Sequence, residues 1–151
     1  MSLNSNPGRK VARLIVLDAR DSVLLLRYSE YRANRPPSFW ATPGGQLEDG
    51  EQSRDAAIRE LAEETGLSAE LGRKLWQKTF TFELPQGFVD QHEEYFLVES
   101  PEVNPPVQNF SAEPIQEHRW WTLPELQAAQ VEVAVYMCQC FYLRDEIERC
   151  T

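Results

Sequence analysis

The chain has 151 residues and a formal net charge of −9. A chain of this length forms one domain with a core of its own. The negative charge argues against broad binding to nucleic acids or to anionic membranes, because both require basic patches on the protein. No apolar run reaches the length that spans a membrane, and no charged-then-apolar leader opens the chain. We therefore expect neither a nucleic-acid partner nor a membrane partner.

Three cysteines, Cys138, Cys140 and Cys150, lie close together near the C-terminus. An odd number of crowded cysteines is typical of free thiols in an intracellular protein and not of a disulfide framework. This pattern favours a cytoplasmic location.

The first third of the chain alternates between predicted strands and polar connections. Residues 1–9 are polar and are expected to be flexible, so the domain is predicted to cover residues 10–151. A turn at residues 18–21 and an arginine-bearing loop at residues 28–37 separate three extended segments. These are residues 11–17, 22–27 and 38–42, the last of which leads into Pro43-Gly44-Gly45.

The remainder of the chain contains a helix, more strands and further helices. Strands are predicted at residues 74–84, 93–99 and 117–122, with a turn at Pro85-Gln86-Gly87 and a proline-bearing loop at residues 100–114. Pro124 is predicted to open a helix, since proline is well tolerated in the first turn, and a longer helix is predicted at residues 133–148. Strands with helices on each side indicate a layered α/β/α domain.

A group of closely spaced glutamates precedes Gly66. On a helix, which turns about 100° per residue, Glu64 lies roughly 40° to one side of Glu60 and Glu63 lies roughly 60° to the other. The three carboxylates therefore share one face. The opposite face is predicted to pack on the core through Ile58, Leu61, Ala62 and Thr65, with Ser53 or Asp55 as the N-terminal cap and Gly66 ending the helix.

Carboxylates gathered in a cleft favour a bound cation. At about 6 Å and an effective dielectric constant near 20, each pair of carboxylates repels by roughly 3 kcal/mol. A divalent cation bound between them makes the net interaction attractive. Oxygen ligands select magnesium, manganese or calcium over zinc. Taken alone, the glutamates fit a solvated acidic helix face equally well.

The spacing of the whole segment is more specific than the glutamates alone. Gly45 is followed after five residues by Glu51, and after seven more by Arg59-Glu60-Leu61-Ala62-Glu63-Glu64-Thr65-Gly66-Leu67. This pattern resembles the Nudix box at every fixed position. Weaker likeness extends from about residue 10 to about residue 125 and includes Arg119-Trp120-Trp121. The resemblance implies an α/β/α sandwich around a mixed β-sheet.

The resemblance also implies a reaction and a set of ligands. Nudix enzymes hydrolyse a nucleoside diphosphate linked to another group, with magnesium as the usual metal and manganese as an alternative. Glu60, Glu63, Glu64 and the carbonyl of Gly44 correspond to the metal ligands. Arg59 and Glu51 correspond to a salt bridge that orients the helix and the loop, and arginine can hold a carboxylate with two hydrogen bonds, which lysine cannot.

The general base that activates water is open at this point. Glu63 and Glu60 are the candidates on the helix. Glu113 and Glu117 precede the tryptophan-containing strand, where some relatives carry an extra carboxylate. Glu93 and Glu94 are further options. For each glutamate outside the helix, a solvated surface position is the competing interpretation.

Some aromatic and basic residues have two interpretations. Trp40 is predicted to belong to the core rather than to stack on a base. One of Trp120 and Trp121 is predicted to be core and the other to border the pocket, since they point to opposite faces. Neither His92 nor His118 is read as a ligand. Phosphate binding and simple exposure remain alternatives for Arg27, Arg32 and Arg35.

The substrate is not named by the box, because specificity arises outside it. For so short a chain a nucleoside triphosphate is ranked first, with ADP-ribose or a nucleotide sugar as alternatives. A catalytically silent nucleotide-binding module and an acidic calcium-binding domain are the competing functions. Nudix dimers are frequent, so a homodimer is compatible with the resemblance.

Overall fold

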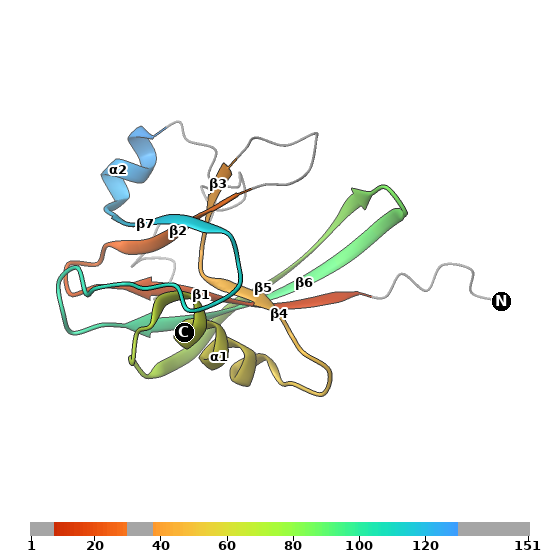
Figure 1. The fold of residues 1–151 in the computed structure, drawn as a ribbon, viewed down its shortest axis with the longest axis horizontal. Helices are drawn as coiled ribbons and strands as arrows, with labels where there is room; N and C mark the ends of the chain where they lie inside the picture. Colours follow the sequence, from red (N-terminus) through yellow and green to blue (C-terminus); the bar gives the residue numbers. More distant parts are fainter. Residues whose placement is uncertain (1–7, 30–37, 130–151) are drawn as a thin grey trace.

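The computed structural model describes residues 8–29 and 38–129. These residues form seven strands and two α-helices (Figure 1). The strands are β1 (Arg9–Leu17), β2 (Val23–Ser29), β3 (Ser38–Ala41), β4 (Gly44–Gln46), β5 (Leu71–Leu84), β6 (Gly87–Glu99) and β7 (Ile115–Trp121), and the helices are α1 (Ser53–Thr65) and α2 (Leu123–Ala128).

The strands form one mixed sheet that opens in its middle. Its central order is β3-β2-β1-β6-β5, with β1 parallel to β6 and the other pairs antiparallel. β1 pairs with β2 at Leu17 and Val23, next to the turn that joins them. Further along β1, residues 11–13 pair with β4, while β2 continues between β3 and β7. The two halves of the sheet therefore diverge, and β4 lies inside the opening.

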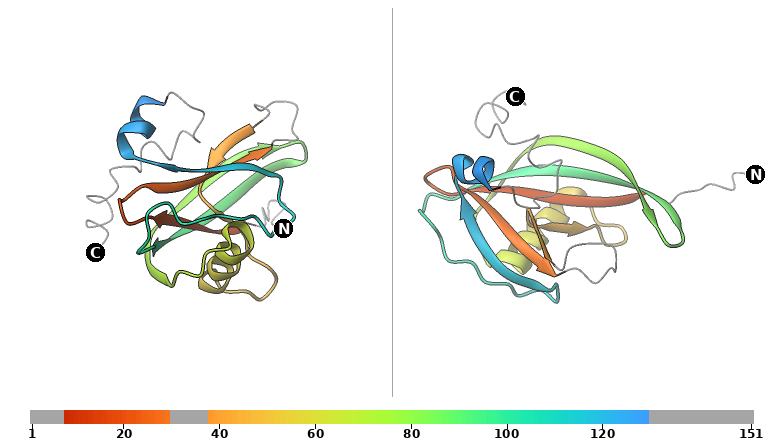
Figure 2. Two further views of the ribbon diagram at one scale, coloured as in Figure 1. Left: turned by 60° about the vertical axis from the view of Figure 1, so that its left-hand side comes forward. Right: turned by 90° about the horizontal axis from the view of Figure 1, so that it is seen from above.

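The helices cover opposite faces of the sheet (Figures 1 and 2). Alternate β1 residues Leu14 and Val16 pack with Leu61 of α1, whereas Ile15 and Leu17 pack with Leu126 of α2. The cluster on the α2 face also contains Trp40, Tyr95, Leu97 and Trp121. The mixed sheet with a helix on each face confirms the predicted α/β class. The described residues contain no helix with the length and apolar character needed to cross a membrane.

The face of α1 that packs on the sheet differs from the prediction. Ile58 is 51% exposed and Ala62 is also exposed, so two of the four predicted core residues are wrong. The helix instead turns a face containing Ala56 and Ala57 toward the sheet, together with two of the glutamates. Because alanine side chains are small, the backbone of α1 can approach the strands closely. This face of α1 therefore packs on the sheet although its apolar pattern is weak.

The ends of α1 show one wrong and one confirmed prediction. Gln52 is the N-cap residue and makes no side-chain capping hydrogen bond, so neither Ser53 nor Asp55 caps the helix. At the other end, Gly66 has φ 67°, in the left-handed region that favours glycine, and its N–H binds the carbonyl of Ala62.

The hairpin of β5 and β6 is longer than predicted. β5 begins at Leu71 and β6 at Gly87, and the paired strands extend well past the rest of the sheet in Figure 1. The prediction missed residues 71–73 of β5 and 87–92 of β6, most of which are exposed or only partly buried and give no clear apolar alternation. The predicted helix at residues 133–148 lies outside the described residues, as do the three cysteines, Arg32 and Arg35.

Candidate functional site

Helix α1 buries two glutamates, one against Gly45 of β4 and one against Tyr28 of β2. Glu60 is 7% exposed and Glu64 is fully buried. A Cβ atom placed on Gly45 would lie 2.5 Å from Oε1 of Glu60, so only glycine leaves room for this carboxylate. The acidic face of the helix is therefore gathered in the interior, contrary to the alternative of a solvated acidic surface for these two residues.

Glu64 has one strong partner and one unsatisfied oxygen. The Tyr28 hydroxyl donates to Oε2 at 2.5 Å, while Oε1 has no hydrogen-bond donor among the described residues. The pKa of Glu64 is raised above its usual value, chiefly by burial and also by the neighbouring charge of Glu60, although the Tyr28 hydrogen bond acts to lower it. Burial also raises the pKa of Tyr28, which keeps its hydroxyl protonated as the donor.

Arg59 binds carboxylates on α1 and in the loop that precedes it. Its Nε and Nη2 donate to the two oxygens of Glu51, both at 2.9 Å. Nη1 binds Oε1 of Glu60 at 2.8 Å and Oε2 of Glu63 at 3.3 Å, and Nη2 also reaches the carbonyl of Gln46 at 3.2 Å. The hydrogen bonds from Arg59 to Glu51 lower the pKa of Glu51 to about 2. One guanidinium group thus joins the helix to the loop that precedes it.

A pocket of about 350 Å³ lies where the sheet opens. Its walls come from β1, β2, β3 and β4 and from the loop before β7, including Arg13, Tyr28, Gly44, Gly45 and Glu113. Because Tyr28 binds Glu64 and Gly45 contacts Glu60, the pocket adjoins the buried carboxylates.

The outlying glutamates occupy different positions. Glu113 lines the pocket and is exposed. Glu117 is not among the described residues that line it and forms an ion pair with Arg27 at 2.9 Å. Glu93 is buried and pairs with Arg13, whereas Glu94 lies 3.7 Å from the Lys74 ammonium.

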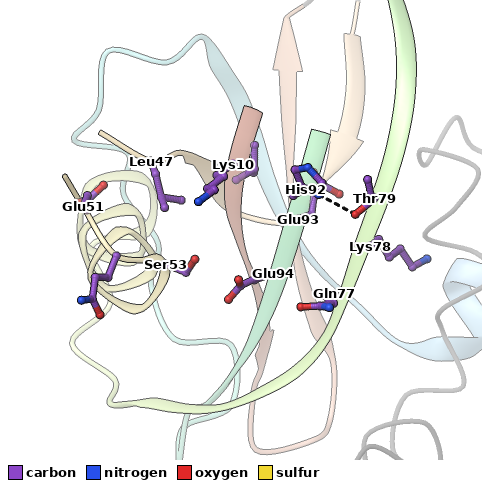
Figure 3. Close-up of a pocket in the computed structure, with 12 residues that line it drawn as sticks. Lys10, Leu47, Glu51, Ser53, Gln77, Lys78, Thr79, His92, Glu93 and Glu94 are labelled. Carbon is purple, nitrogen blue, oxygen red and sulfur yellow. Dashed lines mark hydrogen bonds between the residues drawn. The ribbon is translucent and has the colours of Figure 1, made fainter. Parts of the chain in front are cut away.

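A second, larger hollow of about 510 Å³ lies between the start of α1 and the β5–β6 hairpin (Figure 3). Lys10, Glu94 and Gln77 project into it, and His92 binds the Thr79 hydroxyl at 2.8 Å. Its walls carry both signs of charge.

The residues at the buried cluster fit a divalent cation. Two adjacent buried carboxylates, one with an oxygen that has no donor, form a site that a hard cation would relieve. Within the described residues, no three His, Cys, Asp or Glu side chains already surround one point. Glu63 is turned to Arg59 and its side chain is 45% exposed. Glu60 and Glu64 are thus brought together, while Glu63 would complete the set by leaving Arg59.

Some residues of the site were missed from the sequence. Tyr28 was expected in a loop but is the sixth residue of β2. Strand alternation from Leu24 and Leu26 provides a usable signal, since all three residues face α1. Trp40, at 8% exposure, and Trp121 are core as predicted, and Trp120 is partly buried on the α1 face.

Comparison with known proteins places this arrangement in a family. The sequence profile of the NUDIX domain matches residues 7–137. The m7GpppN-mRNA hydrolase NUDT17 of Xenopus laevis is 37% identical over 103 residues, which is 63% of this chain and 34% of that protein. The putative 8-oxo-dGTP diphosphatase of Bacillus subtilis is 39% identical over 64 residues, which is 42% of this chain and 39% of that protein. The chain thus spans little more than a third of the length of these curated relatives.

Solved structures share the fold. The MutT protein from Methanosarcina mazei Go1 aligns with a TM-score of 0.66 and 24% identity over 97% of this chain and 94% of that chain. The NUDIX domain of Shewanella oneidensis NrtR, crystallised with ADP ribose, aligns with a TM-score of 0.69 and 20% identity over 98% of this chain and 95% of that chain.

Proposed function

The chain belongs to the NUDIX family, and from this premise we propose that it is a metal-dependent hydrolase of a nucleoside diphosphate linked to another group. One observation carries the proposal. Glu60 and Glu64 are both buried, Glu60 against Gly45 and Glu64 against Tyr28, and Gly45 and Tyr28 line a pocket that opens between two halves of the sheet. Two adjacent buried carboxylates repel each other while both are charged, and a bound cation relieves that repulsion.

The proposed ligands are Glu60, Glu63, Glu64 and the carbonyl of Gly44, with magnesium as the metal and manganese as a substitute. When bound, a divalent cation polarises phosphoryl oxygens and lowers the pKa of water. The chain's own residues hold this site in shape. Tyr28 fixes the orientation of Glu64, and Arg59 ties the helix to Glu51 in the preceding loop.

Glu113 is the general base that we propose. Glu113 is exposed and lines the same pocket as Gly44 and Gly45, where its carboxylate can accept a proton from water in front of the diphosphate. Glu117 is less suitable because its carboxylate is paired with Arg27. Glu63 is the alternative base on the helix, since half of its side chain is accessible.

Two relatives support the substrate class that we propose. The m7GpppN-mRNA hydrolase NUDT17 and the putative 8-oxo-dGTP diphosphatase are both named for substrates with linked phosphates. A pocket of about 350 Å³ is at the small end of ligand sites, which favours one nucleotide over a dinucleotide. We therefore rank a nucleoside triphosphate first and ADP-ribose or a nucleotide sugar second, for a cytoplasmic enzyme.

A substrate panel tests the proposal. Nucleoside triphosphates, oxidised nucleotides, nucleotide sugars and ADP-ribose are incubated with the protein and magnesium, and release of pyrophosphate, phosphate or nucleoside monophosphate is measured. We expect turnover that requires the metal and disappears in Glu64→Gln. Binding without hydrolysis across the panel would instead identify a silent nucleotide-binding module.

A further inference from the structure

A buried ion pair lies beside the proposed site. Glu93 is fully buried, and its Oε2 accepts hydrogen bonds from Nε of Arg13 at 3.0 Å and from Nε2 of Gln91 at 2.9 Å. The Tyr95 hydroxyl donates to Oε1 at 3.0 Å. Both oxygens of this carboxylate are therefore held by donors, which fixes the position of the carboxylate.

Arg13 joins this carboxylate to the pocket. Its backbone lies between Gly44 in β4 and Tyr95 in β6. A Cβ atom on Gly44 would lie 3.0 Å from Cδ of Arg13, so the arginine stem passes directly against this glycine. Nη1 reaches the carbonyl of Thr42 at 3.4 Å, and Arg13 lines the pocket together with Gly44 and Gly45.

Side-chain packing alone does not explain why the charged pair of Arg13 and Glu93 occupies this position. Apolar side chains of similar volume would fill the same space at equal or lower cost in folding free energy. A guanidinium that is oriented by a buried carboxylate at a pocket wall is, however, prepared to bind an anion. Its planar array of donors matches the oxygens of a phosphate, and little conformational entropy remains to be lost on binding.

We propose, on the basis of the proposed function, that Arg13 binds the diphosphate group of the substrate and that Glu93 is a positioning residue that acts through Arg13. Arg13 contacts the phosphate oxygens from the β1 wall of the pocket that Glu113 also lines. Glu93 is not among the described residues that line this pocket, and its side chain is fully buried, so it acts on the substrate only through Arg13.

The test uses imidodiphosphate, a diphosphate analogue that is not hydrolysed, together with the best substrate from the panel. Its inhibition constant is measured with magnesium for wild type, Arg13→Lys and Glu93→Gln. We expect the inhibition constant and the KM to rise by about ten-fold or more in Arg13→Lys, since lysine cannot reproduce the two-pronged contact. Glu93→Gln should raise both by a smaller factor. The double variant should have an inhibition constant no higher than that of Arg13→Lys alone.

The matched controls are Arg119→Lys and Glu125→Gln. These residues form another arginine–glutamate ion pair and do not line the pocket. They should leave the inhibition constant unchanged. If Arg13→Lys also leaves it unchanged while circular dichroism shows a folded protein, Arg13 does not bind the diphosphate. Additive losses in the double variant would overturn the positioning role of Glu93.

A measurement on the wild type remains available if a variant fails to fold. The Nε resonance of Arg13, assigned through its own side-chain carbons, should shift when imidodiphosphate is added, and an unmoved resonance at saturating analogue contradicts the inference. Failure of the proposed function is distinguishable, because the wild type would then show no magnesium-dependent turnover on any member of the panel.

Discussion

Arg59 holds four glutamates at once, and this makes its geometry more important than its charge. It contacts Glu51, Glu60 and Glu63 within 3.3 Å and Glu48 at 3.7 Å. Lysine carries the same charge but has one donor centre, so it can keep one of these contacts and must release the others. The orientation of the helix relative to its preceding loop depends on the full set.

Replacing Arg59 by Lys should therefore lower kcat/KM by about ten- to a hundred-fold, the cost of losing one to two charge-assisted hydrogen bonds. Steady-state kinetics on the best substrate measure this effect. The control is Arg54→Lys on the same helix, whose guanidinium binds the carbonyls of Gly72 and Leu71. Equal kinetics for wild type and Arg59→Lys would remove the proposed role of the Arg59–Glu51 pair.

Glu63 and Glu64 should both be required for turnover but not for the fold. Glu64→Gln and Glu63→Gln keep the size of the side chain, so the fold should stay near intact while turnover falls by about a thousand-fold or more, through loss of ligand charge. Rapid-quench or coupled assays measure the rate, and circular dichroism checks the fold. Glu70→Gln, at an exposed position after the helix, is the control. Near wild-type rates in Glu64→Gln would exclude it as a ligand.

At the scale of elements, β4 connects the sheet to the carboxylates through two glycines with different constraints. Gly44 has φ 148°, and a Cβ there would lie 2.1 Å from the carbonyl oxygen of Ala12. At Gly45 the obstacle is the flexible end of Glu60. Gly44→Ala must therefore move backbone, whereas Gly45→Ala can be accommodated if the carboxylate moves.

We expect Gly44→Ala to lower the free energy of unfolding by roughly 2 kcal/mol or more, from strain and overpacking. Gly45→Ala should cost less stability but should weaken metal-dependent activity. Gly87→Ala is the control, since its φ is 130° and a Cβ there meets open space. Urea unfolding and kinetics separate the two effects. If both alanine variants in β4 lose stability and activity in the same ratio, the distinction is wrong.

The sequence predicted the elements better than their contacts. Helix α1 and its glycine end were found from spacing and from the box, because both signals are local. The face that α1 buries was assigned from apolar residues, and Ile58 showed the failure of that rule: it is exposed while Glu64 is fully buried. A helix that buries carboxylates next to glycines gives no periodic apolar signal. The opening of the sheet and the pairing of Arg13 with Glu93, 80 residues apart, arise only from tertiary structure.

At the scale of the whole molecule, the Arg59–Glu51 contact links stability to pH. Hydrogen bonds from Arg59 lower the pKa of Glu51 from 4.5 to about 2. A carboxyl group with a lowered pKa in the folded state stabilises fully above its unfolded pKa. That contribution is lost as the pH falls from about 4.5 toward 2.

Glu51→Gln should therefore destabilise the protein at neutral pH, and the difference from wild type should shrink as the solution is acidified below about pH 4.5. Urea unfolding at a series of pH values from 7 to 3 measures both curves. The Glu125→Gln variant removes another carboxylate with a lowered pKa, whose partners are Thr122 and Arg119, and it leaves the Arg59 contacts unaltered. Parallel curves for wild type and Glu51→Gln would contradict the assignment.

The net charge of −9 gives a bound cation an effect on the whole fold. Self-repulsion lowers the stability of a compact acidic chain, and the buried Glu60–Glu64 pair concentrates that repulsion at one point. A ligand that binds only the folded state stabilises it by about 2.7 kcal/mol at a hundred times its dissociation constant. Magnesium or manganese should therefore raise the Tm of the wild type.

Glu64→Gln separates this specific effect from general screening. Without metal it should be about as stable as the wild type, because the raised pKa of Glu64 favours a neutral carboxyl and glutamine is neutral as well. With metal it should gain little. Scanning calorimetry measures the Tm of both proteins in magnesium chloride and in sodium chloride at matched ionic strength. The comparison separates specific metal binding from general screening. Since sodium screens the surface charge but does not bridge buried carboxylates, a Tm rise that is equal in the two salts, or equal in wild type and Glu64→Gln, would show that the cluster binds no divalent cation.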